Sequence, residues 1–161
     1  MNEMITASPL PPTCQRCGQE GRACRMQLVH LHHYWSQKRG GRRFPSRRDI
    51  DPIELGPMLP NIYLVDVLPG PQFRYRLAGS DVEEIHGQSL TGKTPADIRT
   101  PEVARLIEQQ YVEALKERAP RCDHLTLIGE DGSYWHFERL ILPLSDTGED
   151  INMFLCGIYR T

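Results

Sequence analysis

The chain has 161 residues, of which 39% are apolar and 25% charged, a composition typical of one globular domain and too short for two comfortable ones. Its longest apolar runs, such as Leu140-Ile141-Leu142, are only strand-sized, which excludes a membrane span, and its first residues do not resemble a secretory signal. The five cysteines, an odd number, argue against a disulfide framework, so we expect reduced thiols and a cytoplasmic protein.

The formal net charge of −2 hides an asymmetry between the two ends of the chain. Residues 1–48 contain nine Lys and Arg against two Glu, whereas residues 49–161 contain ten Lys and Arg against nineteen Asp and Glu. A basic segment of this kind fits an acidic partner, a nucleotide, or a segment that docks on the acidic body of its own chain. The last possibility needs no further partner and is our first expectation.

Residues 1–26 differ in composition from the rest of the chain. They contain prolines, glycines and three cysteines but almost no large apolar residues. This composition predicts a flexible or metal-ordered extension. We therefore divide the chain into this extension and one domain over residues 27–161, which includes its own N-terminal helix.

That N-terminal helix is predicted over residues 27–39. Leu28, Leu31 and Trp35 recur at helical spacing, and two glycines at 40–41 end the pattern. An apolar stripe on a helix can bind a partner, so we expect these three side chains to form a dimer or partner interface. A second, short helix should begin at Asp51-Pro52, because Asp caps helices and Pro suits their first position.

The next elements are two strands and two helices. β-branched and alternating apolar residues predict strands at 62–67 and 73–77, joined by a turn at 69–71 into an antiparallel hairpin. Capping residues at Ser80 predict a short helix that Gly87 ends, and Thr100-Pro101 begins the main helix, 101–118.

The remaining residues predict strands at 125–128, 134–144 and 151–159, the first two joined by the Asp131-Gly132 turn. Strands grouped at both ends of a helical middle argue against a doubly wound sheet and favour an α+β fold.

Several short motifs occur together over roughly residues 30–160: Tyr34-Trp35, Arg39–Arg43, Pro45–Arg47, Asp49–Pro52, Leu59-Pro60, Leu64–Val67, Phe73–Gly79 and Leu90–Gly92. In these motifs and in the order of its elements, the sequence resembles the PAS domain superfamily, and within it a group of small standalone bacterial proteins. The resemblance implies a five-stranded antiparallel sheet with helices crossing between strands two and three, and a pocket used for ligand sensing or dimerisation. The cysteine-containing extension departs from the resemblance, as does His86, where an apolar or aromatic residue is expected.

Half of a zinc motif lies in the extension. Cys14 and Cys17 have the spacing at which two thiolates bind one ion. Cys24 together with His30, His32 or His33 of the following helix would complete a Cys₃His site. No second Cys-x-x-Cys pair follows. The alternatives are a zinc site and an extension with incidental cysteines.

A basic loop follows the first helix. Arginine guanidinium groups bind carboxylate and phosphate through two parallel hydrogen bonds. The arginines of this loop that could bind an anion or an acidic partner are Arg39, Arg42, Arg43, Arg47 and Arg48. The alternative, which we favour, is that they pair with nearby acids such as Asp49 and Glu54. With a pI near 6.3 and no nucleic-acid-binding motif, we do not expect binding to nucleic acid.

Residues 87–94 match the phosphate-binding loop pattern G-x-x-x-x-G-K-T. Such a loop needs a buried strand before it and a long helix after it. Here a polar, capped helix precedes the pattern and Pro95 follows it, so we interpret the match as chance and do not expect an enzyme. Haem and flavin are not expected either, because helix 101–118 contains no His, Cys or Met and no asparagine-cysteine-arginine motif occurs.

Three aromatic residues, Tyr75, Tyr111 and Phe137, are candidates for lining a small cavity between the main helix and the sheet, the alternative being ordinary core packing. The predicted function is a PAS-type sensory or regulatory module that binds a small ligand or a protein partner and signals through association. The alternative is a zinc- or nucleotide-binding regulatory protein that uses the cysteines or the basic loop.

Overall fold

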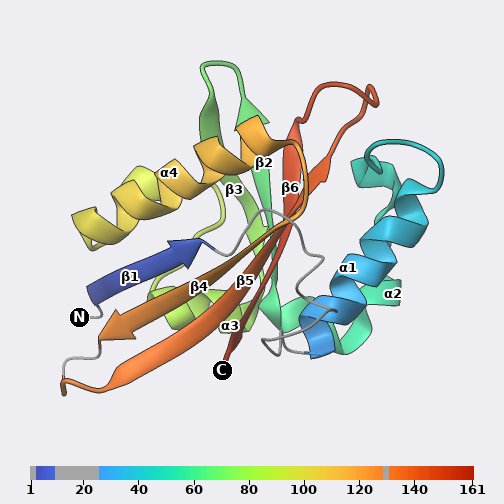
Figure 1. Ribbon diagram of the computed structural model, residues 1–161. Coiled ribbons are helices and arrows are strands. Elements are labelled where there is room, and N and C mark those ends of the chain that lie inside the picture. The colour runs from blue at the N-terminus through green and yellow to red at the C-terminus, as the bar shows by residue number, and fades with distance from the viewer. Residues whose placement is uncertain (1–2, 10–25, 129–130) are drawn as a thin grey trace.

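One antiparallel sheet runs through the middle of the protein, with helices on both of its faces (Figure 1). The computed structural model describes residues 3–9, 26–128 and 131–161. The predicted five-stranded PAS-like sheet is confirmed, in the order β3-β2-β6-β5-β4. Its strands are β2 (Ile62–Leu68), β3 (Gln72–Ala78), β4 (Arg121–Ile128), β5 (Tyr134–Leu144) and β6 (Met153–Arg160).

A further strand, β1 (Glu3–Pro9), lies at the edge of the sheet and pairs antiparallel with β4. The sequence predicted no strand there, because this segment has no clear alternation of apolar and polar residues and its partner lies far away along the chain. The rest of the proposed extension, including Cys14, Cys17 and Cys24, falls mostly in residues 10–25, outside the described part of the chain.

The helices begin and end close to the predicted residues. They are α1 (Met26–Arg39), α2 (Pro52–Leu55), α3 (Ser80–His86) and α4 (Pro101–Glu117), with 3₁₀ turns η2 (Arg47–Asp49), η3 (Gly56–Asn61) and η4 (Pro95–Asp97). The Asp51 side chain accepts a hydrogen bond from the Ile53 amide at 2.9 Å, which is the predicted N-cap of α2. Gly87 ends α3 in the left-handed conformation, with φ 65°.

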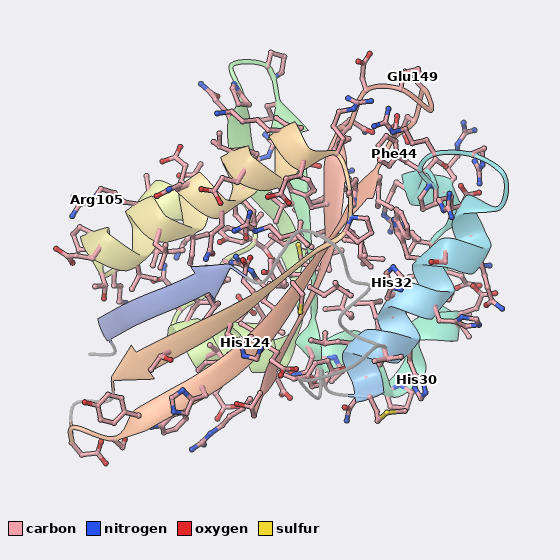
Figure 2. All side chains as sticks on the ribbon, viewed as in Figure 1. His30, His32, Phe44, Arg105, His124 and Glu149 are labelled. Carbon is pink, nitrogen blue, oxygen red and sulfur yellow. The ribbon has the colours of Figure 1, made fainter. Side chains whose placement is uncertain are left out.

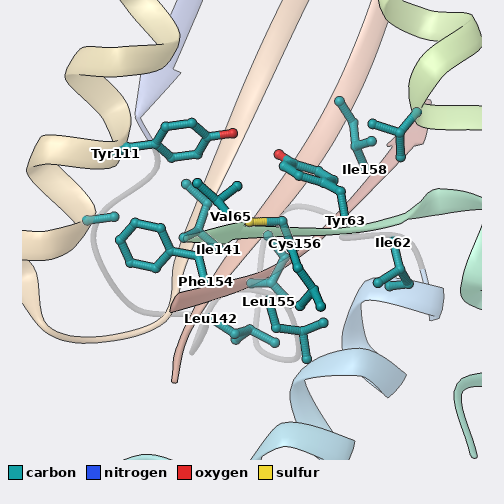
Figure 3. Packing of buried hydrophobic residues seen from close by; sticks show 14 of the residues in the cluster. Ile62, Tyr63, Val65, Tyr111, Ile141, Leu142, Phe154, Leu155, Cys156 and Ile158 are labelled. Atoms are coloured by element: carbon teal, nitrogen blue, oxygen red, sulfur yellow. The ribbon is translucent and has the colours of Figure 1, made fainter. Parts of the chain in front are cut away.

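Strand β6 has both faces buried, because neighbouring side chains along a strand point to opposite faces of the sheet. Phe154 stacks on Tyr111 of α4 with ring centroids 6.0 Å apart, and Cys156 lies on the same face (Figure 3). On the other face, Gly157 lies directly beneath α1. The core therefore has two layers, one between the sheet and α4 and one between the sheet and α1.

The three apolar residues of α1 are part of this core. Leu28 and Leu31 are fully buried, and the Trp35 indole Nε1 donates a hydrogen bond of 2.8 Å to the carbonyl of Pro143 on β5. The prediction that Leu28, Leu31 and Trp35 form an interface with a partner is therefore wrong for this fold. The helical spacing was interpreted correctly, but the surface that covers the stripe is the chain's own sheet.

The contact between α1 and β6 requires a residue without a side chain at position 157. A Cβ atom there would lie 2.8 Å from Leu31 Cδ2 and 3.2 Å from Leu28 Cδ2. We expect Gly157→Val to lower the free energy of unfolding by about 1–3 kcal/mol, because the overpacked helix must shift. Urea unfolding measures the change.

The matched control is Gly41→Ala, at a turn where no atom lies within 4 Å of the added Cβ. The free energy of unfolding of this variant should lie within about 0.5 kcal/mol of the wild-type value. Equal stability of Gly157→Val and the wild type would contradict the close packing of α1.

Candidate ligand-binding site

A cavity of about 250 Å³ lies between α3, the start of α4 and the sheet. Tyr75, Tyr111 and Phe137, the three residues predicted at a cavity, all lie in its wall. Aliphatic side chains form much of the remaining wall: Ile85, Ile98, Val103, Ile107, Leu125 and Ile158. That these residues hold a ligand stays a prediction.

The mouth of the cavity lies between α3 and the segment that precedes α4. Glu84 and Arg99 line the cavity and are exposed, so they belong to its rim. The Gln88 side chain joins the two sides, since its Nε2 donates to the Asp97 carbonyl at 3.0 Å and its Oε1 accepts from the Arg99 amide at 3.2 Å. Gln88, in the loop after α3, thus bridges the two sides of the rim.

Three tyrosine hydroxyl groups gather on the inner wall. Tyr111 on α4 donates a hydrogen bond of 3.3 Å to the hydroxyl of Tyr75 on β3, and Tyr63 on β2 packs against Tyr75 with ring centroids 6.1 Å apart. Figure 3 shows the hydroxyl groups of Tyr63 and Tyr111 directed toward the space between them. Burial raises the pKa of Tyr75 to about 12 and raises the pKa of Tyr63 and Tyr111 well above 10. All three stay protonated at neutral pH and can donate hydrogen bonds.

A buried ionic network extends from the cavity wall toward α4. Asp123 on β4 is fully buried and accepts from two arginines, Arg121 Nε at 3.0 Å and Arg139 Nη2 at 2.9 Å. Arg121 Nη1 also pairs with Glu113 at 2.9 Å and Glu117 at 2.8 Å, both on α4. The network therefore fixes α4 to strands β4 and β5.

Arg139 is the member of this network that lines the cavity. Its side chain is 1% exposed, and its guanidinium carbon lies 5.6 Å from the centroid of the Tyr111 ring. Nη2 donates to Asp123 and to Gln110 Oε1, whereas Nε, also buried, has no hydrogen-bond partner among the described residues. Sequence analysis missed this residue. Alternation along β4 and β5 does place Asp123 and Arg139 on one face, but only the strand register, which pairs them directly, shows that they meet.

His86, the last residue of α3, forms another polar part of the wall. Burial, followed by the positive charge of Arg139, lowers the pKa of His86 to about 4, so its imidazole is neutral at pH 7. The departure of His86 from the family resemblance was noticed in the sequence, and the structure places it at the cavity.

The basic loop mostly bonds to its own surroundings. Arg42 pairs with Asp49 at 2.8 Å, as expected, and Arg47 Nη1 donates to the Ile50 carbonyl at 3.0 Å. The guanidinium groups of Arg39 and Arg43 lie over the rings of Trp35 and Phe44, and Arg48 is exposed. Lys38 pairs with Glu54 at 2.8 Å. These contacts favour the structural alternative, and anion binding by this loop stays a prediction.

The proposed zinc ligands are not brought together within the described residues. His30 is exposed near the start of α1 (Figure 2), and its three cysteine partners lie outside the described part of the chain. Residues 3–9, 26–128 and 131–161 contain no group of three His, Cys, Asp or Glu that could hold a metal ion. Zinc binding through Cys14, Cys17 and Cys24 stays a prediction.

The segment that matches a phosphate-binding loop runs beside β3. The Gly92 amide donates to the Tyr75 carbonyl at 2.7 Å, and the Tyr75 amide donates to the Lys93 carbonyl at 2.8 Å. The short turn η4 follows it, where nucleotide binding would need the start of a long helix. The segment therefore lacks the strand-loop-helix context of a phosphate site.

Comparison with known proteins agrees with this architecture. The family model described as PAS domain matches residues 24–159, so the chain belongs to the PAS domain family, whose members are sensory and regulatory modules. A search of curated proteins finds no match. None of the described helices combines the length and apolar character needed to cross a membrane.

Two solved light-oxygen-voltage domains are similar to the chain. One comes from work on a flavin analogue and the mechanism of the domain; it is 17% identical, with a TM-score of 0.47, and the match covers 63% of this chain and 76% of that one. The other is the light-state structure of the blue-light photoreceptor Aureochrome1 LOV, also 17% identical with a TM-score of 0.47, covering 64% of this chain and 82% of that one.

Removing the shared carboxylate should be costly. Asp123→Asn leaves Arg121 and Arg139 without their buried anion, and we expect the free energy of unfolding to fall by about 3–5 kcal/mol. The control is Glu102→Gln on α4, whose exposed pair with Arg105 at 3.5 Å should contribute at most about 1 kcal/mol. Denaturant unfolding compares the two variants, and a similar small loss in both would refute the role of Asp123.

The pKa of His86 predicts a dependence of stability on pH. Because its folded pKa of about 4 lies below the ordinary 6.5, the unfolded chain binds more protons between these values. The free energy of unfolding should therefore fall as the pH drops from about 6.5 to about 4. The free energy of unfolding of His86→Gln, measured by urea titration, should fall less over the same pH range. Parallel plots of unfolding free energy against pH for the variant and the wild type would disprove the lowered pKa of His86.

Proposed function

We propose that the protein is a PAS-type regulatory module that binds a small molecule in the cavity and signals by associating with a protein partner or with a second copy of itself. The observation that carries the proposal is a cavity with a mostly apolar wall and a few convergent polar groups, the arrangement typical of small-molecule sites. In this proposal the chain is not an enzyme, and its output is a change in binding.

Strand β6 offers a route from the cavity to the surface. Ile158 lines the cavity, and its neighbour Gly157 supports Leu31 of α1 on the opposite face of the sheet. A ligand that shifts β6 by a few tenths of an ångström would change the packing beneath α1, because packed interiors transmit displacements. We place the output on the α1 side of the sheet for this reason.

Native mass spectrometry of the untagged protein tests the proposal, after incubation with a small-molecule extract of the cells that produce it. We expect bound mass on the wild-type chain and a ligand-dependent change in oligomeric mass. Ile107→Trp, which fills the cavity, should lose the bound mass. The matched control Glu108→Trp places the same side chain on the exposed face of α4 and should keep it.

Two results would count against the proposal. A wild-type chain that gains no mass from the extract contradicts ligand binding. Equal bound mass in the two tryptophan variants shows that the molecule binds outside the cavity.

A further inference from the structure

We propose that the molecule bound in the cavity is a small organic carboxylic acid, bound as its carboxylate by Arg139, with its apolar part against the aliphatic and aromatic wall. This proposal rests on the proposed function and names the chemical class of its ligand. It starts from Arg139, a cation that lines the cavity and is almost completely buried.

The bonds of Arg139 leave one of its donors without an acceptor. Its side-chain bonds to Asp123 and Gln110 both leave from Nη2, and Nε has no partner among the described residues. A buried donor without a partner costs about 1–3 kcal/mol, more on a charged group. A carboxylate in the cavity would accept from this donor and remove that cost.

The charge around Arg139 also favours an anion. Among the described residues its carboxylate partner is Asp123, which also pairs with Arg121, so two buried guanidinium groups share one buried carboxylate. The other partners of Arg121, Glu113 and Glu117, lie on α4 and are partly exposed. The positive charge of Arg139 that lowers the pKa of His86 would act on a ligand in the same space.

The remaining polar groups of the inner wall are compatible with a carboxylate. The hydroxyl groups of Tyr63, Tyr75 and Tyr111 stay protonated and can donate hydrogen bonds. Thr100 and Val103 place the first turn of α4 at the cavity, and the start of a helix favours negative charge. Glu84, an acidic residue of the cavity, lies at the exposed rim.

The size and the lining of the cavity limit the rest of the ligand. At about 250 Å³ the cavity is smaller than the roughly 300–1,000 Å³ of pockets for drug-sized ligands. Its apolar side chains suit an aromatic ring or a short aliphatic chain. A phosphate ester fits less well, because a buried dianion needs more compensating charge than one guanidinium supplies.

The test compares acids with their neutral amides on the full chain. The probes are benzoate, phenylacetate and hexanoate, each paired with its amide, in calorimetric titrations and in NMR spectra of the Arg139 Nε–Hε group. We expect at least one acid to saturate the cavity and to shift the Nε–Hε signal. Its amide should bind about 10- to 100-fold more weakly, because a hydrogen bond to a charged group contributes about 1.5–3 kcal/mol.

Variants separate the charge of Arg139 from a general electrostatic effect. Arg139→Gln should lose the preference for the acid, and Arg139→Lys, which keeps the charge but not the Nε donor, should reduce it. The control Arg105→Gln removes a positive charge from the outer face of α4, where Arg105 is labelled in Figure 2, and should keep the preference. If Arg139→Gln does not fold, the wild-type Nε–Hε signal still decides.

Each remaining outcome overturns the proposal. Equal affinity for an acid and its amide, an acid that leaves the Nε–Hε signal unmoved, or no binding of any of the three acids excludes recognition of a carboxylate by Arg139. The proposed function survives these results if native mass spectrometry still shows a molecule in the cavity, and fails only if that experiment fails too.

Discussion

Asp123 joins two arginines inside the protein, and much of the site depends on this carboxylate. Through Arg121 it connects β4 to the acidic face of α4, and through Arg139 it connects β5 to the cavity. An ion pair is costly to desolvate, so a buried one is weak evidence for stability by itself. Its position suggests another role, because it fixes the guanidinium group of Arg139 in the wall of the cavity.

Local chemistry in the sequence predicted most of the fold. The Asp51 cap, the Gly87 terminus and the alternation in β3 each depend on a few neighbouring residues, so their positions could be inferred without knowing what packs against them. The strand β1 could not be inferred, because its stability comes from pairing with β4, more than a hundred residues away. Edge strands of this kind depend on tertiary contacts more than on their own composition.

The candidate site likewise has residues that local sequence could predict and residues that only tertiary contacts reveal. Tyr75, Tyr111 and Phe137 were candidates for a cavity wall because of their aromatic character, and all three line the cavity. Arg139 could not be predicted there, because a charged residue in a strand is expected on the solvent side until its partner is known. The stripe of α1 led to the opposite error: Leu28, Leu31 and Trp35 were correctly seen as one apolar face, but periodicity does not tell which surface covers it.

The unequal attachment of the two sides of the cavity determines how a molecule could pass in and out. Moving α4 away would break the ion pairs of Arg121 with Glu113 and Glu117 together. Opening the rim between α3 and residues 97–99 would break the two hydrogen bonds that the Gln88 side chain makes with the backbone of Asp97 and Arg99. We therefore expect the α3 side of the cavity to open more readily than the α4 side, which the ion pairs of Arg121 fix to the sheet.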